Sequence, residues 1–171
     1  VMQRLSFISL RQLFVTGFFH GDPHPGNVII LPDNRIALID FGIFGELAPS
    51  EREIWRRHFR AFATGDMREA IFQYGKLIIS EPDSDVVAFQ REALLMLEQI
   101  YLAYRNPESP PEQRHIARSS AAMFDLLRQY RLRVTLNNLL FWRTLVALNA
   151  SAFRLSPDFD LLGAQREFFE R

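Results

Sequence analysis

One stretch near the start of the chain, "FFHGDPHPGNVIILPDNRIALIDFG" (residues 18–42), sets two apolar runs among many polar side chains. The runs "VIIL" and "IALI" are separated by "PDNR", which contains residues that favour tight turns. Aliphatic and β-branched residues on both sides of a turn predict a β-hairpin over residues 28–39. Because the two strands of a hairpin are antiparallel, we expect the residues just outside them, Asn27 and Asp40, to lie side by side.

The composition predicts a packed domain and excludes several functions. The chain has 171 residues, 48% of them hydrophobic, and its formal net charge of zero does not favour a nucleic-acid partner. It has no cysteine, which excludes disulfides, thiolate nucleophiles and thiolate zinc sites. The most apolar window, residues 134–153, contains Arg143 and three asparagines, so it predicts a buried helix rather than a membrane span.

Helical periodicity dominates the chain outside the hairpin. Residues 3–17 predict a helix that Gly17 ends, and a short apolar run follows it. Two further helices are expected to begin with capping boxes, Ser50 with Glu53 and Asp66 with Glu69. The remaining predictions are a long amphipathic helix over residues 84–104, a proline-broken loop over 106–114, two or three helices from about residue 116 onward, and a turn over 155–160.

The predicted fold class is mainly α with a small β-hairpin, arranged as a single domain. Residues 1–48 would carry the polar loop and the hairpin, and residues 49–171 would form a helical body. His58 and His115 are expected at the surface. Six phenylalanines are expected in the core (Phe59, Phe62, Phe72, Phe124, Phe141 and Phe153), and three arginines on a solvated helix face (Arg56, Arg57 and Arg60).

The polar residues follow a spacing that has a chemical meaning. Asp22 lies two residues after His20, Asn27 lies five after Asp22, and Asp40 opens an Asp-Phe-Gly triplet. An amide oxygen beside a carboxylate suits a Mg²⁺ ion that also binds phosphate oxygens and water. Asp22 could then accept or orient the proton of an attacking hydroxyl group. The four identities in this strand context match the catalytic loop and metal motif of protein kinases.

The residues next to these are expected to support the structure of the loop. His20 is expected to be structural and to bond the backbone near the metal loop, with Phe41 and Gly42 as further support. His24 follows Asp22 by two residues. It would either contact the transferred phosphate or brace the loop, and the sequence leaves both readings open.

With these residues placed, the chain resembles the UbiB family of atypical kinases. "GFFHGDPHPGNVII" followed by "IALIDFGIFGEL" is similar to the catalytic loop and metal motif of that family, and residues 126–161 resemble its late helices more weakly. The resemblance implies ATP as substrate and Mg²⁺ (or Mn²⁺) as cofactor. It also implies that Asp22 is the catalytic-loop aspartate and that Asn27 and Asp40 bind the metal and the nucleotide. His24 is counted with Asp22 as a catalytic candidate because of its position in the loop.

The resemblance further implies a biological setting. The family supports the biosynthesis of ubiquinone and related prenyl-quinone lipids, so the partners would include lipid precursors or quinone-biosynthesis proteins. The full protein would be associated with a bacterial inner membrane or an organelle membrane. The chain would be a kinase-like C-terminal lobe, because its catalytic loop begins at residue 20 and its single lysine, Lys76, follows the metal motif. We therefore expect the N-terminal lobe and its lysine to be missing and the chain alone to be inactive.

Two alternatives remain open at this point. The motif "HGDPHPGN" followed by "IDFG" also resembles aminoglycoside- and choline-phosphotransferases, although "GIFGEL" and the late helices favour the UbiB family. A non-catalytic pseudokinase or scaffold is the other alternative.

Only "IFGELAP" separates the Asp-Phe-Gly triplet from the next predicted helix, and no Ala-Pro-Glu signature follows. A small or lipidic substrate, or ATP hydrolysis, therefore fits better than a peptide substrate.

Overall fold

A computed structural model describes residues 1–106, 108–110, 113, 116–155 and 161–170. His115, the side chain of Phe153 and nearly all of the predicted turn over 155–160 lie outside the described part. The chain forms two compact units, each described by itself below. The first unit comprises Val1–Arg52 and Leu136–Arg171, and the second comprises Glu53–Thr135. Among the helices that the structure describes, we find none with the length and apolar character that a membrane crossing requires.

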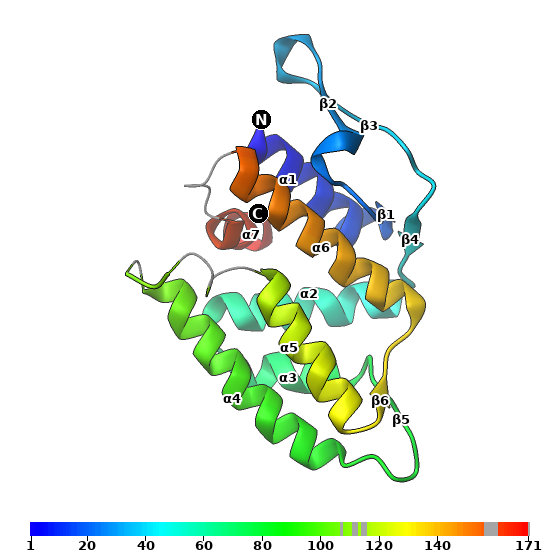
Figure 1. Ribbon diagram of the computed structural model, residues 1–171, viewed down its shortest axis with the longest axis vertical. Helices are drawn as coiled ribbons and strands as arrows, with labels where there is room; N and C mark the ends of the chain where they lie inside the picture. Colours follow the sequence, from blue (N-terminus) through cyan, green and yellow to red (C-terminus); the bar gives the residue numbers. More distant parts are fainter. Residues whose placement is uncertain (107, 111–112, 114–115, 156–160, 171) are drawn as a thin grey trace. The chain divides into compact units, whose positions relative to one another are not determined.

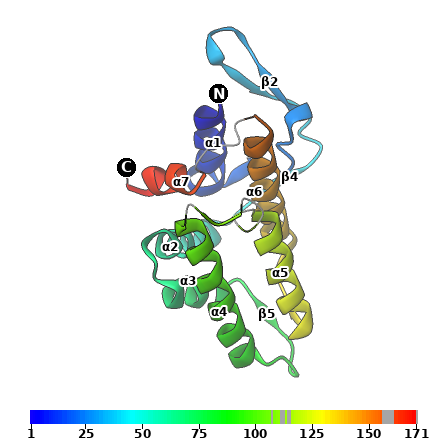
Figure 2. The same cartoon turned by 60° about the vertical axis from the view of Figure 1, so that its left-hand side comes forward.

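Within its described residues, the first unit joins three complete α-helices to two small antiparallel sheets. Strand β1 pairs with β4, and β2 pairs with β3. In Figures 1 and 2 the β2–β3 hairpin projects beyond the helices of this unit. Its elements are α1 (Met2–Arg11), β1 (Phe18–His20), β2 (Val28–Ile30), β3 (Ile36–Leu38), β4 (Phe44–Glu46), α6 (Leu136–Leu155) and α7 (Leu161–Glu170).

The helix predicted before Gly17 is present, but its last turn differs from an α-helix. Gln12–Thr16 form a π-helical turn, and the Gly17 N–H donates to the carbonyl oxygen of Gln12, 2.8 Å away. Gly17 has a φ of +79°, and a Cβ there would lie 2.9 Å from the carbonyl oxygen of Leu47. Glycine is therefore required both for the turn and for the close approach of the chain that follows β4.

The predicted hairpin is confirmed, with strands slightly shorter than expected. Val28 pairs with Leu38, and Ile30 pairs with Ile36. Asp33 and Asn34 in the connecting turn both have positive φ angles, which these two residue types tolerate better than most. The sequence did not predict β4, whose pairing with β1 brings the segment after the Asp-Phe-Gly triplet back to the start of the polar loop.

The core of the first unit is aromatic. Phe14 packs edge-to-face against Phe141 of α6, with the ring centroids 5.7 Å apart, and against Phe169 of α7 at 5.0 Å. Leu5 of α1 and Leu145 of α6 are also fully buried. Edge-to-face pairs add to the free energy gained from burying apolar area. This packing joins α1, α6 and α7 into the body that carries the polar loop.

The second unit is built from helices and one short strand pair. Asp66 caps α3 by accepting from the Glu69 N–H at 3.0 Å, as predicted, but the Glu69 side chain bonds Gln73 instead of completing the box. Asp85 caps α4 in the same way through the Ala88 N–H. The elements are most of α2 (Pro49–Thr64), then α3 (Met67–Gly75), β5 (Ile79–Ser80), α4 (Val86–Arg105), α5 (Ile116–Gln129) and β6 (Leu132–Arg133). Figure 1 shows α4 and α5 running side by side.

Helix α2 begins earlier than predicted, and its capping contact comes from Glu51 instead of Glu53. The helix begins at Pro49, and the Ala48 N–H donates to Oε2 of Glu51 at 3.1 Å. Proline at the first helical position lacks an N–H that would otherwise need a partner, which favours this earlier start. Glu53 pairs with Arg57 instead of serving the helix start.

Some expectations about burial were wrong. His58 is only 3% exposed. Its Nδ1 bonds the carbonyl oxygen of Ala70 at 2.8 Å, and a polar ring with such a partner can be buried in the core. Phe72 is 56% exposed, and the ammonium group of Lys76 lies 4.4 Å from the centre of its ring. Phe124 is partly exposed. The burial of Phe59, Phe62 and Phe141 and the exposure of Arg56, Arg57 and Arg60 are confirmed.

Candidate functional site

The polar loop connects β1 to β2 and is held at its start by the β1–β4 sheet. His20 pairs with Phe44, and the Gly21 N–H donates to the carbonyl oxygen of Ile43 at 2.9 Å. A Cβ at Gly21 would lie 2.7 Å from the side chain of Ile43, so the two backbones can approach only because this residue is glycine. The loop therefore leaves the sheet along a fixed path.

His20 connects the polar loop to the segment that carries Asp40. Its side chain is fully buried, Nδ1 accepts the Asp22 N–H at 3.0 Å, and Nε2 lies 2.8 Å from the carbonyl oxygen of Ile39. Because Nδ1 accepts, Nε2 is the nitrogen that donates. The ring also contacts Phe41, with centroids 4.6 Å apart. The contact expected between His20 and the backbone near Asp40 is thus present at Ile39, directly before Asp40.

Asn27 is buried and bonded on two sides. The side-chain amide Nδ2 donates to the backbone carbonyl oxygen of Asp22 at 3.1 Å. The backbone carbonyl oxygen of Asn27 accepts the Ile39 N–H at 3.0 Å. The ladder of the β2–β3 hairpin therefore continues to the pair of Asn27 and Ile39, and Asp40 is the next residue along the chain. With the amide nitrogen engaged, the amide oxygen of Asn27 is the atom left to receive a ligand.

Asp40 is exposed and adopts an unusual backbone conformation. Its φ is +57°, in the left-handed region that most residues with a Cβ avoid. One carboxylate oxygen, Oδ1, accepts the Gly42 N–H at 3.3 Å, which orients the side chain through the next turn. Residues in such conformations occur often at functional sites, where the surrounding structure supports the strain.

His24 braces the loop. Its Nδ1 accepts the Gly26 N–H at 3.0 Å and caps the single 3₁₀ turn over Pro25–Asn27. Of the two readings left open by the sequence, this contact belongs to the bracing one. Contact between His24 and a phosphate stays a prediction.

Helix α6 supplies three contacts that the sequence did not predict. Thr144 donates to the carbonyl oxygen of His20 at 3.0 Å, and Ser151 donates to that of Pro23 at 3.1 Å. Arg143 Nη2 donates to Oδ2 of Asp22 at 2.7 Å. The single charge in the most apolar window of the chain was the signal that could have identified Arg143.

The donor atoms fit a hard divalent cation. Asn27 and Asp40 offer an amide oxygen and a carboxylate, the oxygen ligands that Mg²⁺ accepts. In the described part of the chain, no group of three or more His, Cys, Asp or Glu side chains could form a metal cage. That is compatible with Mg²⁺, which usually takes one or two protein ligands and completes its shell with waters and phosphate oxygens.

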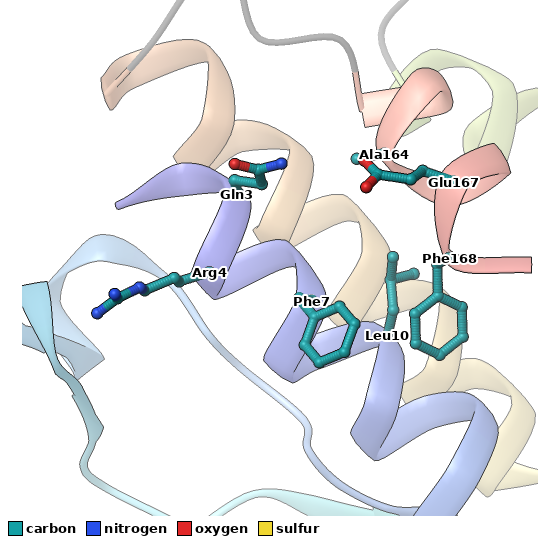
Figure 3. Close-up of a pocket in the computed structure, with 7 residues that line it drawn as sticks. All are labelled: Gln3, Arg4, Phe7, Leu10, Ala164, Glu167 and Phe168. Carbon is teal, nitrogen blue, oxygen red and sulfur yellow. The ribbon is translucent and has the colours of Figure 1, made fainter. Parts of the chain in front are cut away.

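A separate cavity of about 210 Å³ lies between α1 and α7. Figure 3 shows Phe7 and Phe168 on its wall, and their ring centroids are 5.7 Å apart. Arg4 points away from these rings in Figure 3 and donates to the carbonyl oxygens of Asp33 and Asn34 in the hairpin turn. None of the site residues predicted from the sequence lines this cavity.

Comparison with known proteins identifies relatives of the chain. Residues 1–74, which include the whole polar loop and the hairpin, match the ABC1 atypical kinase-like domain. The chain is 28% identical over 167 residues to a probable protein kinase UbiB of Marinobacter nauticus, covering 95% of this chain and 29% of that protein. The chain is related to the UbiB atypical kinases. It is 31% identical over 163 residues to the chloroplastic protein ACTIVITY OF BC1 COMPLEX KINASE 3 of Arabidopsis thaliana, covering 95% of this chain and 22% of that protein.

A third relative of this UbiB-like chain is an uncharacterized protein of Synechocystis sp., which is 30% identical over 161 residues. That alignment covers 90% of this chain and 22% of the relative. The chain thus spans 22% to 29% of the length of these three proteins. The mainly helical fold with small antiparallel sheets is compatible with the kinase-like family.

Proposed function

We propose that this chain supplies the catalytic loop and the metal-binding segment of an ATP-dependent phosphoryl-transfer or ATP-hydrolysing protein. The relatives named as kinases support the reaction class. The resemblance of the sequence to the UbiB family implies a role in ubiquinone biosynthesis, so the setting we propose is the biosynthesis of prenyl-quinone lipids. Asp22 and His24 would belong to the catalytic loop, and Asn27 with Asp40 would hold Mg²⁺ or Mn²⁺ and the phosphates of ATP.

One observation carries the proposal: a single hydrogen-bond network connects Asp22 and Asn27 to Ile39, the residue before Asp40. Asn27 bonds the backbone of both Asp22 and Ile39, and His20 bonds the same two residues through its ring. Two independent bridges therefore link the loop that carries Asp22 to the residue before Asp40. Phosphoryl transfer depends mainly on positioning and on electrostatic stabilisation, which a doubly bridged loop can provide.

Each residue would have a distinct part in the reaction. When bound, the cation would neutralise negative charge on the phosphate oxygens. Asn27 and Asp40 would hold it. Asp22 would orient the attacking hydroxyl group or water and accept its proton, while the new O–P bond forms and the bond to the leaving ADP breaks. His24 would keep the loop in shape between Asp22 and Asn27 through its bond to Gly26.

The segment after the triplet supports a proposal about the substrate class. Residues 43–48 contain β4, which pairs back onto β1, and α2 begins at Pro49. The chain here has no room for the long activation segment on which protein kinases bind peptides. We therefore favour a small or lipidic acceptor, or water.

The test is a nucleotide-binding titration with and without Mg²⁺ on the protein as its gene encodes it. Asp40→Asn should weaken Mg²⁺-dependent ATP binding by about tenfold or more, because the metal loses its charged ligand. Asp33→Asn is the matched control, since it removes the same charge from an exposed residue that also has a positive φ. Wild-type binding by the Asp40 variant would reject the metal assignment.

Turnover tests Asp22 separately. Asp22→Asn should keep nucleotide binding but lower turnover by roughly 10²-fold or more, which is the usual contribution of a positioned general base. Unchanged turnover would make Asp22 a structural residue. Loss of nucleotide binding in this variant would instead show that Asp22 belongs to the nucleotide site.

A further inference from the structure

The ion pair between Arg143 and Asp22 joins two residues that are 121 positions apart. Arg143 Nη2 lies 2.7 Å from Asp22 Oδ2, and the side chains are 51% and 24% exposed. Exposed ion pairs contribute about 0–1 kcal/mol to stability, and this one is only partly buried. Its contribution to folding is therefore small, which raises the question of what else the contact does.

Helix α6 fixes the backbone on both sides of Asp22. Thr144 bonds the carbonyl oxygen of His20, and Ser151 bonds that of Pro23. Each hydroxyl oxygen also lies 2.9 Å from a carbonyl oxygen of its own helix, that of Leu140 and that of Ala147 respectively, so its single proton is shared between the two acceptors. Residues 144 and 151 are seven positions apart and lie on nearly the same side of a helix, so one face of α6 holds the loop at two points.

Arg143 belongs to the same helix. Its guanidinium group contacts the side chain of Asp22, which lies between His20 and Pro23 in the loop. It occupies Oδ2 of Asp22, while Asn27 and the His24 N–H occupy the carbonyl oxygen of Asp22. In the part of the chain that the structure describes, Oδ1 of Asp22 makes no hydrogen bond. One carboxylate oxygen is thus held, and the other is left for a substrate.

We propose that Arg143 is a positioning residue for the reaction: it holds Oδ2 of Asp22 so that Oδ1 is presented to the acceptor hydroxyl or water. This inference rests on the function proposed above. An arginine suits the task because its planar, permanently charged guanidinium group fixes the direction of the hydrogen bond that it donates. The loop carries Asp22, and α6 carries the guanidinium group that orients its carboxylate.

The experiment measures turnover by the protein as its gene encodes it. Arg143→Gln should lower kcat roughly 10- to 100-fold, because a small misplacement of a catalytic group has effects of this size. The KM for ATP should stay within about twofold, since Arg143 acts on Asp22 and not on the nucleotide. Arg143→Lys should recover part of the loss. Arg154→Gln, which removes an exposed arginine from the same helix, is the matched control and should behave as the wild type.

A double-mutant cycle separates positioning from a general structural effect. If Arg143 acts through Asp22, adding Arg143→Gln to Asp22→Asn should change kcat by less than about twofold. A full additional loss in that background would overturn the inference. So would an Arg143 variant with normal kcat, or one whose defect lies in the KM for ATP.

A measurement independent of activity keeps this inference distinct from the proposed function. Asp22 can be modified with a carbodiimide and an amine, and the extent of reaction measured by peptide mass spectrometry. We expect Asp22 to react several times faster in Arg143→Gln than in the wild type or in Arg154→Gln, because its carboxylate has lost its partner. Equal rates would overturn the pairing. Absence of ATP turnover by the wild type, with the expected labelling, would reject the proposed function and leave the pairing in place.

Discussion

Thr144 donates its hydroxyl proton to the carbonyl oxygen of His20, 3.0 Å away and 124 residues earlier in the chain. This bond is buried, and it fixes the point at which the polar loop leaves β1. Because His20 also bonds Ile39 and Asp22, a single hydroxyl group on α6 supports both halves of the candidate site.

Thr144→Val should therefore destabilise the protein. The substitution keeps the shape of the side chain but leaves the His20 carbonyl oxygen without this donor, which has a cost of about 1–3 kcal/mol when the group is buried. Urea unfolding measures the change. Thr64→Val is the control, because Thr64 is exposed and bonds only carbonyl oxygens of its own helix. The control should change the free energy of unfolding by no more than about 0.5 kcal/mol. Equal losses for both variants would contradict a special part for Thr144.

A second prediction concerns the sheet that begins the loop. Gly45 of β4 faces the buried ring of Phe19 across the β1–β4 pair, and a Cβ at this position would overlap that ring. Gly45→Ala should destabilise the protein by about 1–3 kcal/mol, as overpacking a core does. Thermal or urea unfolding provides the measurement.

Gly75→Ala is the comparison for this variant. At the end of α3 the new Cβ would lie 3.1 Å from the amide nitrogen of Gln90, a side chain that can move. Alanine is a better helix former than glycine, so this variant should match or exceed the stability of the wild type. A Gly45 variant as stable as the Gly75 variant would show that the β1–β4 pair can open without loss.

The sequence predicted the local parts of the site, because the hairpin, its turn and the spacing from His20 to Asp40 all lie within one short segment. It did not predict the contacts of Arg143, Thr144 and Ser151, since these depend on how α6 packs more than 100 residues later. The hydrophobic periodicity predicted the helix, but it did not predict which loop the helix would contact.

The errors at helix ends and in the core have similar physical reasons. The start of α2 was assigned to Ser50 from a familiar spacing, although Pro49 and Glu51 provide a better one. His58 was assigned to the surface because of the arginines around it. Its burial depends on the carbonyl oxygen of Ala70, a partner that lies inside the next helix, α3, and has no sequence signature.

A third prediction separates charge from conformation at Asp40. With a φ of +57°, this position should accept asparagine, which tolerates the left-handed region, but not valine, whose branched Cβ clashes there. Asp40→Val should be less stable than Asp40→Asn by about 1–3 kcal/mol in urea unfolding. Similar stabilities would mean that the backbone relaxes when the side chain changes. The same pair of variants shows whether any loss of ATP binding comes from the missing charge or from a distorted loop.

The last prediction is a dependence of stability on pH that originates at His58. Burial lowers the pKa of His58 from its ordinary value near 6.5 to about 4, although its bond to Ala70 opposes this in part. In the unfolded chain the ring takes up a proton as the pH falls through 6.5, whereas in the folded protein it stays uncharged until about pH 4. The unfolded state therefore binds more protons within this window. Stability is fully present above the unfolded value, and it should fall by an amount on the order of 3 kcal/mol as the pH drops from 7 to 4.

His58→Asn isolates this effect, because asparagine can still donate to the Ala70 carbonyl oxygen but does not titrate. The variant should be less stable than the wild type at pH 7, since the smaller side chain leaves space beside Trp55 and Tyr74, whose ring centroids lie 5.4 and 5.7 Å from that of His58. The difference in free energy of unfolding between the two proteins should then shrink as the pH falls. Other acids and histidines titrate equally in both proteins, so they cancel in this difference. A difference that stays constant from pH 7 to pH 4 would show that His58 becomes accessible to water and takes up its proton without unfolding.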